Sequence, residues 1–281
     1  MVSDDGTAAA MSFLETKKIR SVAGASAGAM AAMLLAMGIS PRKAADFCST
    51  IDLPAFADPF GIGSIFKGDI FEQLMRDFMK SQMPPGHSLR IQNSTIPVAV
   101  TGFDLQSLET LIMTKGCAAR SSRASATFPF LFQPVHWVHH EDEPISRSDN
   151  NDNDNIRSMK KDYILIDGGV LDGFGLEGLT VMYPDERKRV VNMVVGNFGG
   201  VGTGVPPGPS EMPEGLVASE LLSISMRNLP QCGPWAMENG PRAVEAANKA
   251  MLASLDLPLY RGKETGHYEL HIDASSFSSP R

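Results

Sequence analysis

Short runs of consecutive apolar residues alternate along the chain with longer stretches in which apolar residues recur every three or four positions. Short apolar runs bounded by glycine, proline or polar residues are typical of buried strands, and the three-to-four spacing is typical of helices. We therefore expect buried strands over residues 19–23, 96–103, 133–138, 163–166 and 190–195. A strand over 109–114 would form a hairpin with the one before it. This mixture of strands and helices predicts an α/β protein.

Helices are expected over residues 27–37, 41–48, 70–80, 214–228 and 241–255. Asp69 stands where an N-cap would begin the third of these helices, which carries one apolar stripe. The last two helices are amphipathic and would cover the sheet. The clearest stripe on the final helix consists of Val244, Ala247, Met251 and Leu255. The alternating residues 268–272 predict a half-buried or edge strand.

Length and composition fit a single globular domain over residues 1–281. The 25 basic residues are outnumbered by 32 acidic ones, and the net charge of −7 argues against nucleic acid as a partner. It leaves apolar insertion at a lipid interface open. Three scattered cysteines, Cys48, Cys117 and Cys232, are expected as buried thiols and form neither a disulfide framework nor a zinc site. No apolar run reaches the ~18 residues of a membrane span, and the start is acidic, so we expect a cytoplasmic or peripheral membrane protein.

Three loop segments suggest cofactor or ligand sites when read by themselves. Residues 139–161 are strongly polar and predict a disordered insertion, but they lack the glycine and glutamate spacing of a calcium loop. The glycines of 196–204 are followed by prolines where a dinucleotide-binding helix would have to begin. We therefore expect neither a metal nor a cofactor. Residues 59–66 are unusually apolar for a loop and are expected to pack on the core, with a flap facing an acyl chain as the alternative.

The stretch Gly24-Ala25-Ser26-Ala27-Gly28 links a short strand to an alanine-rich helix. A serine in that place, with glycine on both sides, predicts a nucleophile elbow. We expect the turn to strain the serine backbone, and side chains at Gly24 and Gly28 to collide with the neighbouring strand and helix. The helix would direct unpaired N–H groups, that of Ala27 first, at negative charge developing beside the hydroxyl.

Asp167 follows a buried strand and precedes Gly168 and Gly169. A carboxylate at this place can accept the proton of the serine hydroxyl directly, so a Ser/Asp pair needs no histidine. An apolar environment supplied by Ile166 and Val170 would raise its pKa and suit it to act as a base. Asp104 also ends a strand but lacks the glycines, which makes it the second candidate for the base.

With these motifs the chain resembles the patatin-like phospholipase family, lipid acyl hydrolases that use a Ser/Asp dyad. The likeness rests on residues 24–28, on 167–169 and on the segment 124–135 between them, Ala-Ser-Ala-Thr-Phe-Pro-Phe-Leu-Phe-Gln-Pro-Val. It covers about residues 8–255 apart from the polar insertion.

The resemblance implies a three-layer α/β/α fold around a central, mostly parallel sheet. It also implies cleavage of acyl esters in phospholipids or related lipids through an acyl-enzyme, with Ser26 as the nucleophile and Asp167 as the base. Ala27, Gly24, Gly28, Gly168 and Gly169 would support the site. The expected partner is the lipid substrate, with peripheral membrane contact left open.

The family's glycine-rich oxyanion loop has no counterpart in the first residues, where Gly6 stands alone. We therefore expect the domain to be incomplete at its N-terminus, as a truncated gene model would be. The loss of oxyanion donors is costly, at about 10²- to 10³-fold in rate for one donor. An alternative is therefore a catalytically impaired protein that binds lipid or regulates. A third reading is an α/β-hydrolase with a Ser-His-Asp triad completed by His267 or His271.

Overall fold

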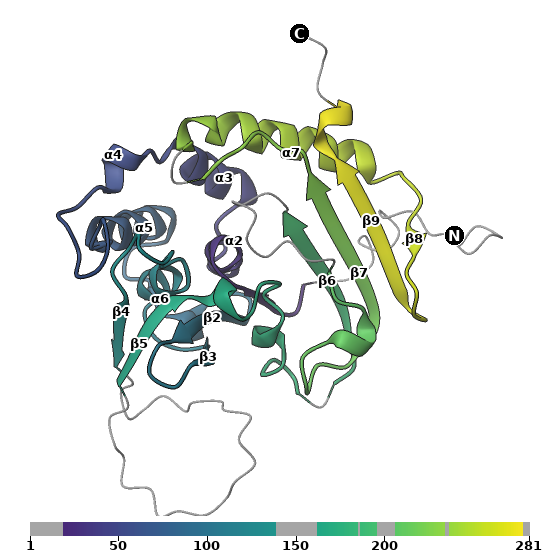
Figure 1. Cartoon of the computed structure of the whole chain (residues 1–281), viewed down its shortest axis with the longest axis horizontal. Coiled ribbons are helices and arrows are strands. Elements are labelled where there is room, and N and C mark those ends of the chain that lie inside the picture. The colour runs from purple at the N-terminus through teal and green to yellow at the C-terminus, as the bar shows by residue number, and fades with distance from the viewer. Residues whose placement is uncertain (1–18, 139–161, 185, 196–205, 234–235, 278–281) are drawn as a thin grey trace, which may run out of the picture. The chain divides into compact units, whose positions relative to one another are not determined.

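The computed structural model describes residues 19–138, 162–184, 186–195, 206–233 and 236–277 (Figure 1). The described residues form two compact units. The N-terminal unit comprises Arg20–Ala44 and Pro54–Met182, and the C-terminal unit includes Ala45–Leu53 and Tyr183–Arg281. Residues 1–18, the predicted insertion at 139–161 and the glycines of 196–204 lie outside the described residues, so the expectations placed on them stay predictions.

The N-terminal unit is built on a sheet of five strands. These are β1 (Val22–Gly24), β2 (Val98–Asp104), β3 (Glu109–Met113), β4 (Val135–Val138) and β5 (Asp162–Asp167). β1 runs parallel to β2, whereas the pairs β2–β3, β2–β5 and β4–β5 are antiparallel. The predicted hairpin of β2 and β3 is confirmed. In β2 six of the seven residues are buried, as expected of a strand with neighbours on both edges and cover on both faces.

Two helices of the N-terminal unit, α2 (Ala27–Ala36) and α6 (Ala118–Ser125), pack on β2 and on each other. α2 buries small and flexible side chains, among them Ala29, Met33 and Leu34, and so approaches the sheet closely. α5 (Asp69–Gln82) packs on α6 and buries Phe71, Met75 and Met79. Two further helices, α3 (Pro41–Thr50) and α4 (Leu53–Phe56), lie where the chain passes between the units.

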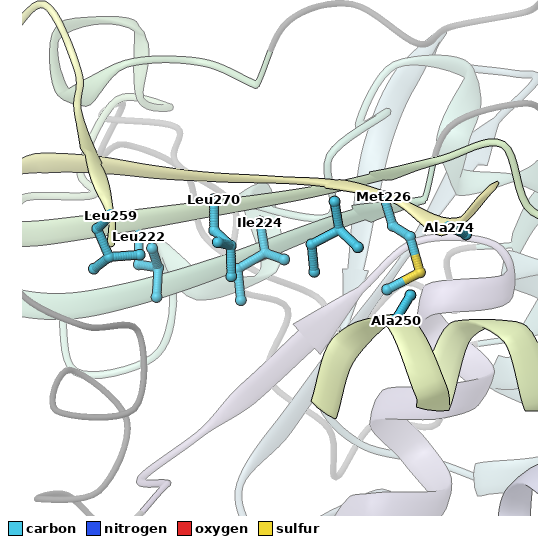
Figure 2. Close-up of a cluster of buried hydrophobic side chains, with 8 residues drawn as sticks. Leu222, Ile224, Met226, Ala250, Leu259, Leu270 and Ala274 are labelled. Atoms are coloured by element: carbon cyan, nitrogen blue, oxygen red, sulfur yellow. The ribbon is translucent and has the colours of Figure 1, made fainter. Parts of the chain in front are cut away.

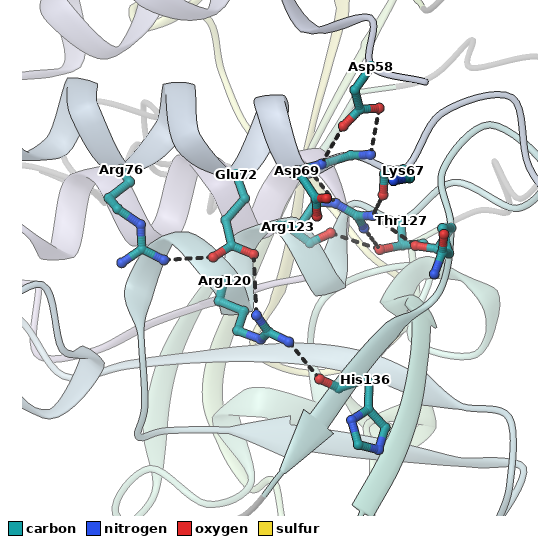
Figure 3. Close-up of polar contacts among 11 residues, drawn as sticks. Asp58, Lys67, Asp69, Glu72, Arg76, Arg120, Arg123, Thr127 and His136 are labelled. Atoms are coloured by element: carbon teal, nitrogen blue, oxygen red, sulfur yellow. Dashed lines mark hydrogen bonds and ion pairs between the residues drawn. The ribbon is translucent and has the colours of Figure 1, made fainter. Parts of the chain in front are cut away.

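The start of α5 differs from the prediction, which made Asp69 the N-cap. Gly68 is the N-cap, in a left-handed conformation with φ 85°, and Asp69 is the first helical residue. The carboxylate of Asp58 accepts hydrogen bonds from the backbone N–H groups of Gly68, Asp69 and Ile70 at 2.9, 2.6 and 3.1 Å (Figure 3). A side chain ten residues upstream therefore does what a local cap would do.

The C-terminal unit contains a second sheet in the order β6-β7-β9-β8. Its strands are β6 (Lys188–Val195), β7 (Ala218–Arg227), β9 (His267–Asp273) and the short edge strand β8 (Tyr260–Arg261). The pairs β6–β7 and β7–β9 are parallel. One face of this sheet and the helix α7 (Gly240–Ser254) enclose a buried apolar cluster (Figure 2). Its members are Leu222, Ile224, Met226, Ala250, Leu259, Leu270, Ile272 and Ala274.

The helix predicted over 214–228 is wrong, because these residues contain the strand β7. The sequence Leu-Leu-Ser-Ile-Ser-Met from Leu221 to Met226 has apolar residues at spacings that also suit a helix. All six are buried, since β7 lies between β6 and β9 and both of its faces are covered. A central strand needs no alternation of polar and apolar residues. Pairing with β6 and β9, and not the local spacing, therefore makes these residues a strand instead of a helix.

The predicted α/β class is confirmed, with helices packed on sheets in each unit. The strands of the N-terminal sheet are less parallel than expected, since only β1 and β2 run parallel there. The other parallel pairs, β6–β7 and β7–β9, lie in the C-terminal unit. The cysteines are free, but the expected burial is wrong for Cys48 and Cys232, which are exposed. Among the described residues no helix is long and apolar enough to cross a membrane.

Candidate active site

Ser26 lies between the end of β1 at Gly24 and the start of α2 at Ala27. Its backbone has φ 54° and ψ −125°, a conformation that residues with a side chain rarely adopt. A strained strand-to-helix turn was predicted here and is present. A β-carbon on Gly24 would lie 2.4 Å from the backbone oxygen of Gly28, so the strand and the helix can approach this closely only because position 24 is glycine.

Gly28 does not have the steric role that was predicted for it. A β-carbon built there meets nothing within 4 Å. Both Ala27 and Gly28 are exposed, and their N–H groups belong to the first turn of α2, where the helix itself supplies no acceptor. The absence of a side chain at Gly28 therefore leaves open space beside the serine at the positive end of a helix.

Asp167 is the last residue of β5 and is 5% exposed. The Ser26 hydroxyl donates a hydrogen bond to its Oδ2 at 2.7 Å, across 141 positions of sequence. The other oxygen, Oδ1, accepts from the Gly169 N–H at 2.8 Å. Burial raises the pKa of the Asp167 carboxyl above its usual value, while these two hydrogen bonds oppose the rise. Val170, one of the two residues expected to supply an apolar environment, is itself 47% exposed.

The glycines after Asp167 allow the turn to lie close to the sheet and to the serine. A β-carbon on Gly168 would stand 2.2 Å from the backbone oxygen of Thr101 on β2, which no side chain could tolerate. One on Gly169 would come within 3.1 Å of the Asp167 carboxylate and 3.8 Å of the Ser26 β-carbon. Close approach therefore requires glycine at position 168, whereas a side chain at position 169 would displace the Asp167 carboxylate by a few tenths of an ångström.

The C-terminal end of α6 holds both members of the Ser26–Asp167 pair. The Ser26 N–H donates to the hydroxyl oxygen of Ser125 at 3.0 Å, and the Asp167 N–H donates to the Thr127 carbonyl at 2.9 Å. Ser125 and Thr127 are completely buried. One three-residue segment thus fixes the backbones of two residues that are far apart in sequence.

A model of one protein family, described as patatin-like phospholipase, matches residues 6–180, which is more than half of the chain. The chain belongs to the patatin-like phospholipase family. This family consists of lipid acyl hydrolases, and its fold is of the α/β class found here. No curated protein is similar enough to the chain to be matched to it. The matched residues include Ser26, Asp167 and residues 124–135 between them.

Within the patatin-like domain, sequence reasoning missed two buried residues that hold the surroundings of Ser26 and Asp167, namely Ser125 and Asp172. The Asp172 carboxylate accepts hydrogen bonds from the N–H groups of Leu176 (2.8 Å) and Glu177 (3.3 Å) and from the Thr101 hydroxyl (3.2 Å). Burial first, and the charge of Glu177 in addition, raise the pKa of Asp172 to about 6. An aspartate just before a Gly-Phe-Gly turn could have signalled this local capping role. Ser125 gives no comparable local signal, because its partner is 99 positions away.

Asp104, the second candidate for the base, is engaged elsewhere. Its carboxylate accepts hydrogen bonds from the N–H groups of Gln106, Ser107 and Ile164 and from the Ser107 hydroxyl. Burial alone would raise the pKa of Asp104, but these hydrogen bonds outweigh it and lower the pKa. An aspartate that closes the β2–β3 turn and stays ionised is a structural group and a weak base.

The histidines proposed for a triad have partners within the second sheet. A ring nitrogen of His267 lies 3.2 Å from the Ser223 hydroxyl, and one of His271 lies 2.7 Å from the Ser225 hydroxyl. Both serines are on β7, next to β9. Each histidine therefore pairs with a serine of the neighbouring strand. The side chain that accepts the hydrogen bond from the Ser26 hydroxyl is Asp167.

Proposed function

We propose that this chain hydrolyses acyl esters of phospholipids or related lipids with Ser26 as the nucleophile and Asp167 as the general base. The 2.7 Å hydrogen bond from Ser26 Oγ to Asp167 Oδ2 carries the proposal, because it joins the only proton the serine can lose to a carboxylate of raised pKa. Membership of a family of lipid acyl hydrolases supplies the substrate class.

In the first step, Ser26 Oγ attacks the carbonyl carbon of the ester while Asp167 Oδ2 takes the hydroxyl proton. In this mechanism the Ala27 N–H, in the first turn of α2, donates to the oxyanion that forms. The intermediate then expels the alcohol, which leaves with the proton held by Asp167. Water attacks the acyl-serine in the second step and gives its proton to Asp167. When the second intermediate releases the carboxylic acid, Asp167 returns this proton to Ser26 Oγ, which restores both the hydroxyl and the carboxylate.

Substitution of each member of the pair tests this function. Ser26→Ala should abolish release of fatty acid from phosphatidylcholine, and Asp167→Asn should slow it by about 10²- to 10⁴-fold, the usual contribution of a general base. A fluorophosphonate probe phosphonylates an activated serine and expels fluoride, so it should add the mass of one probe less HF to the unaltered chain and nothing to Ser26→Ala.

Matched substitutions separate this mechanism from its alternatives. Asp104→Asn removes a carboxylate that also ends a strand, and His271→Ala removes a triad candidate, so both variants should keep hydrolysing lipid. Full turnover in Ser26→Ala would refute the assignment of the nucleophile. A loss in Asp104→Asn equal to that in Asp167→Asn would refute the assignment of the base.

A further inference from the structure

Two loops of the N-terminal unit present large apolar side chains to solvent. Phe60 and Ile62 on residues 59–66 are each 84% exposed, and Phe130 on residues 128–135 is 82% exposed. We refer to residues 59–66 and 128–135 together as the apolar loop pair. The expectation that residues 59–66 pack on the core holds for Phe66 at their end and fails for Phe60 and Ile62.

The two loops are fastened to each other by backbone hydrogen bonds. The N–H groups of Ile65 and Phe66 donate to the carbonyls of Phe130 and Leu131, and the Gln133 N–H donates to the Phe66 carbonyl, all at 2.9 Å. These bonds hold the backbones of the two loops side by side. Phe130 itself has φ 65°, an unusual conformation for a bulky residue that is sustained by these surrounding bonds.

A buried arginine anchors the base of the apolar loop pair (Figure 3). The Arg123 guanidinium, 3% exposed, donates to the carbonyls of Lys67 (2.5 Å), Gly68 (3.0 Å) and Gln133 (2.8 Å). It also lies 5.2 Å from the centre of the Phe132 ring. Burial lowers the pKa of Arg123 to about 10, so it stays charged at neutral pH. The exposed tips thus stand on a base that is held by buried hydrogen bonds.

The apolar loop pair contains no charged residue in either of its eight-residue segments, in a chain where 20% of residues are charged. It offers no ion pair to a nucleic acid or to a charged peptide. Exposed phenylalanine and isoleucine side chains without charge match the interior of a lipid layer, where burial of apolar area is the stabilising contribution.

The apolar loop pair is continuous with the candidate active site. Thr127, whose carbonyl binds the Asp167 N–H, directly precedes Phe128, which is 39% exposed. Val170 and Leu171, which follow Gly169 in the chain, are 47% and 54% exposed. Exposed apolar side chains thus follow closely in sequence the two residues that bond Asp167, namely Thr127 and Gly169.

We propose that the apolar loop pair inserts Phe60, Ile62 and Phe130 into the surface of a phospholipid bilayer and so brings the Ser26–Asp167 site to its substrate. The role of this docking in hydrolysis rests on the proposed function, whereas the docking itself does not. Binding depends on apolar burial, so it persists in concentrated salt.

The test is sedimentation of the full chain with phosphatidylcholine vesicles. The double substitution Phe60→Ser and Phe130→Asn should weaken binding at least tenfold, since burying one phenylalanine side chain contributes about tenfold or more. Asparagine is chosen at position 130 because it tolerates the left-handed backbone. The double substitution Leu108→Asn and Leu252→Ser is a matched control, because these leucines are 66% and 59% exposed and Leu108 has φ 58°. This control should bind as the unaltered chain does.

Three results would overturn the proposal: no binding by the unaltered chain, equal losses in the test and control pairs, or unchanged binding in the test pair. Sedimentation velocity without lipid adds a fourth. If the unaltered chain is a dimer, and the double variant Phe60→Ser and Phe130→Asn is a monomer that still binds vesicles, the loops bind a second copy of the chain instead of lipid. Ser26→Ala should bind vesicles normally, so a failure of the proposed chemistry would leave the docking result standing. Equal thermal unfolding midpoints would show that both double variants are folded.

Discussion

Asp172 should make the stability of the protein depend on pH in the opposite sense to Asp104. Burial, followed by the charge of Glu177, keeps a proton on Asp172 up to pH about 6 in the folded protein. In the unfolded chain the proton leaves near the usual value of 3.8. Between these two pH values the folded state binds more protons than the unfolded state. The free energy of unfolding therefore falls as pH rises through this window.

The size of the effect follows from the pKa of Asp172. A rise from 3.8 to about 6 corresponds to about 3 kcal/mol, at roughly 1.4 kcal/mol for each pH unit. This stabilisation is complete below pH ~4 and is absent above the folded pKa. Because Asp172 is only 5% exposed, solvent screens little of it.

Urea unfolding followed by circular dichroism from about pH 4 to pH 7 measures this contribution. Asp172→Asn cannot ionise, so the difference in free energy of unfolding between the unaltered chain and this variant should shrink by about 3 kcal/mol across the range. Asp104→Asn is the control. The pKa of Asp104 is lowered, so its stabilisation is present at neutral pH and is lost as pH falls through the folded value. A difference for Asp172→Asn that does not change with pH would refute the reasoning.

Three further tests, two of them with a control substitution, probe the packing of the site and the core, each read as thermal or urea unfolding. Gly24→Ala should destabilise the turn at Ser26, because its β-carbon would lie 2.4 Å from a backbone oxygen. Gly28→Ala is the control and should fold normally. Equal unfolding midpoints for the two variants would contradict the structure. Ser125→Ala should cost about 1–3 kcal/mol by leaving the N–H of the nucleophile without its acceptor, and should slow hydrolysis. Leu222→Ala should cost about 2–5 kcal/mol, and Leu252→Ala, exposed on α7, less than ~0.5.

Most elements could be predicted from the sequence because their signals are local. Strands β2 and β5 are short apolar runs, and α5 and α7 have clear helical spacing bounded by glycine or proline. β7 could not be predicted, because the same residues suit a helix until two neighbouring strands are known. The cap of α5 failed for the same reason, since the carboxylate that provides it belongs to Asp58.

In the candidate site, too, some residues could be predicted from local sequence and others could not. Ser26 and Asp167 are recognisable because glycines mark the turns that present them. A β-carbon at Gly24 would meet a backbone atom, as predicted, and one at Gly168 would meet the backbone of Thr101, which was not predicted. The buried partner Ser125 leaves no trace in the local sequence. Gly28 shows the limit of a motif, since its position is as expected but its physical reason is open space and not close packing.

The long separation in sequence between Ser26 and Asp167 has a consequence for folding kinetics. Their hydrogen bond closes a loop of 141 residues. The Ser26 N–H gains its acceptor only when Ser125, 99 residues away, is in position. Contacts of such high order carry a large closure entropy and form late in folding. During refolding we therefore expect the circular dichroism signal of the helices to recover first and the reactivity of Ser26 toward a serine-directed probe to recover later. Reactivity of the nucleophile would then show that the N-terminal unit has finished folding.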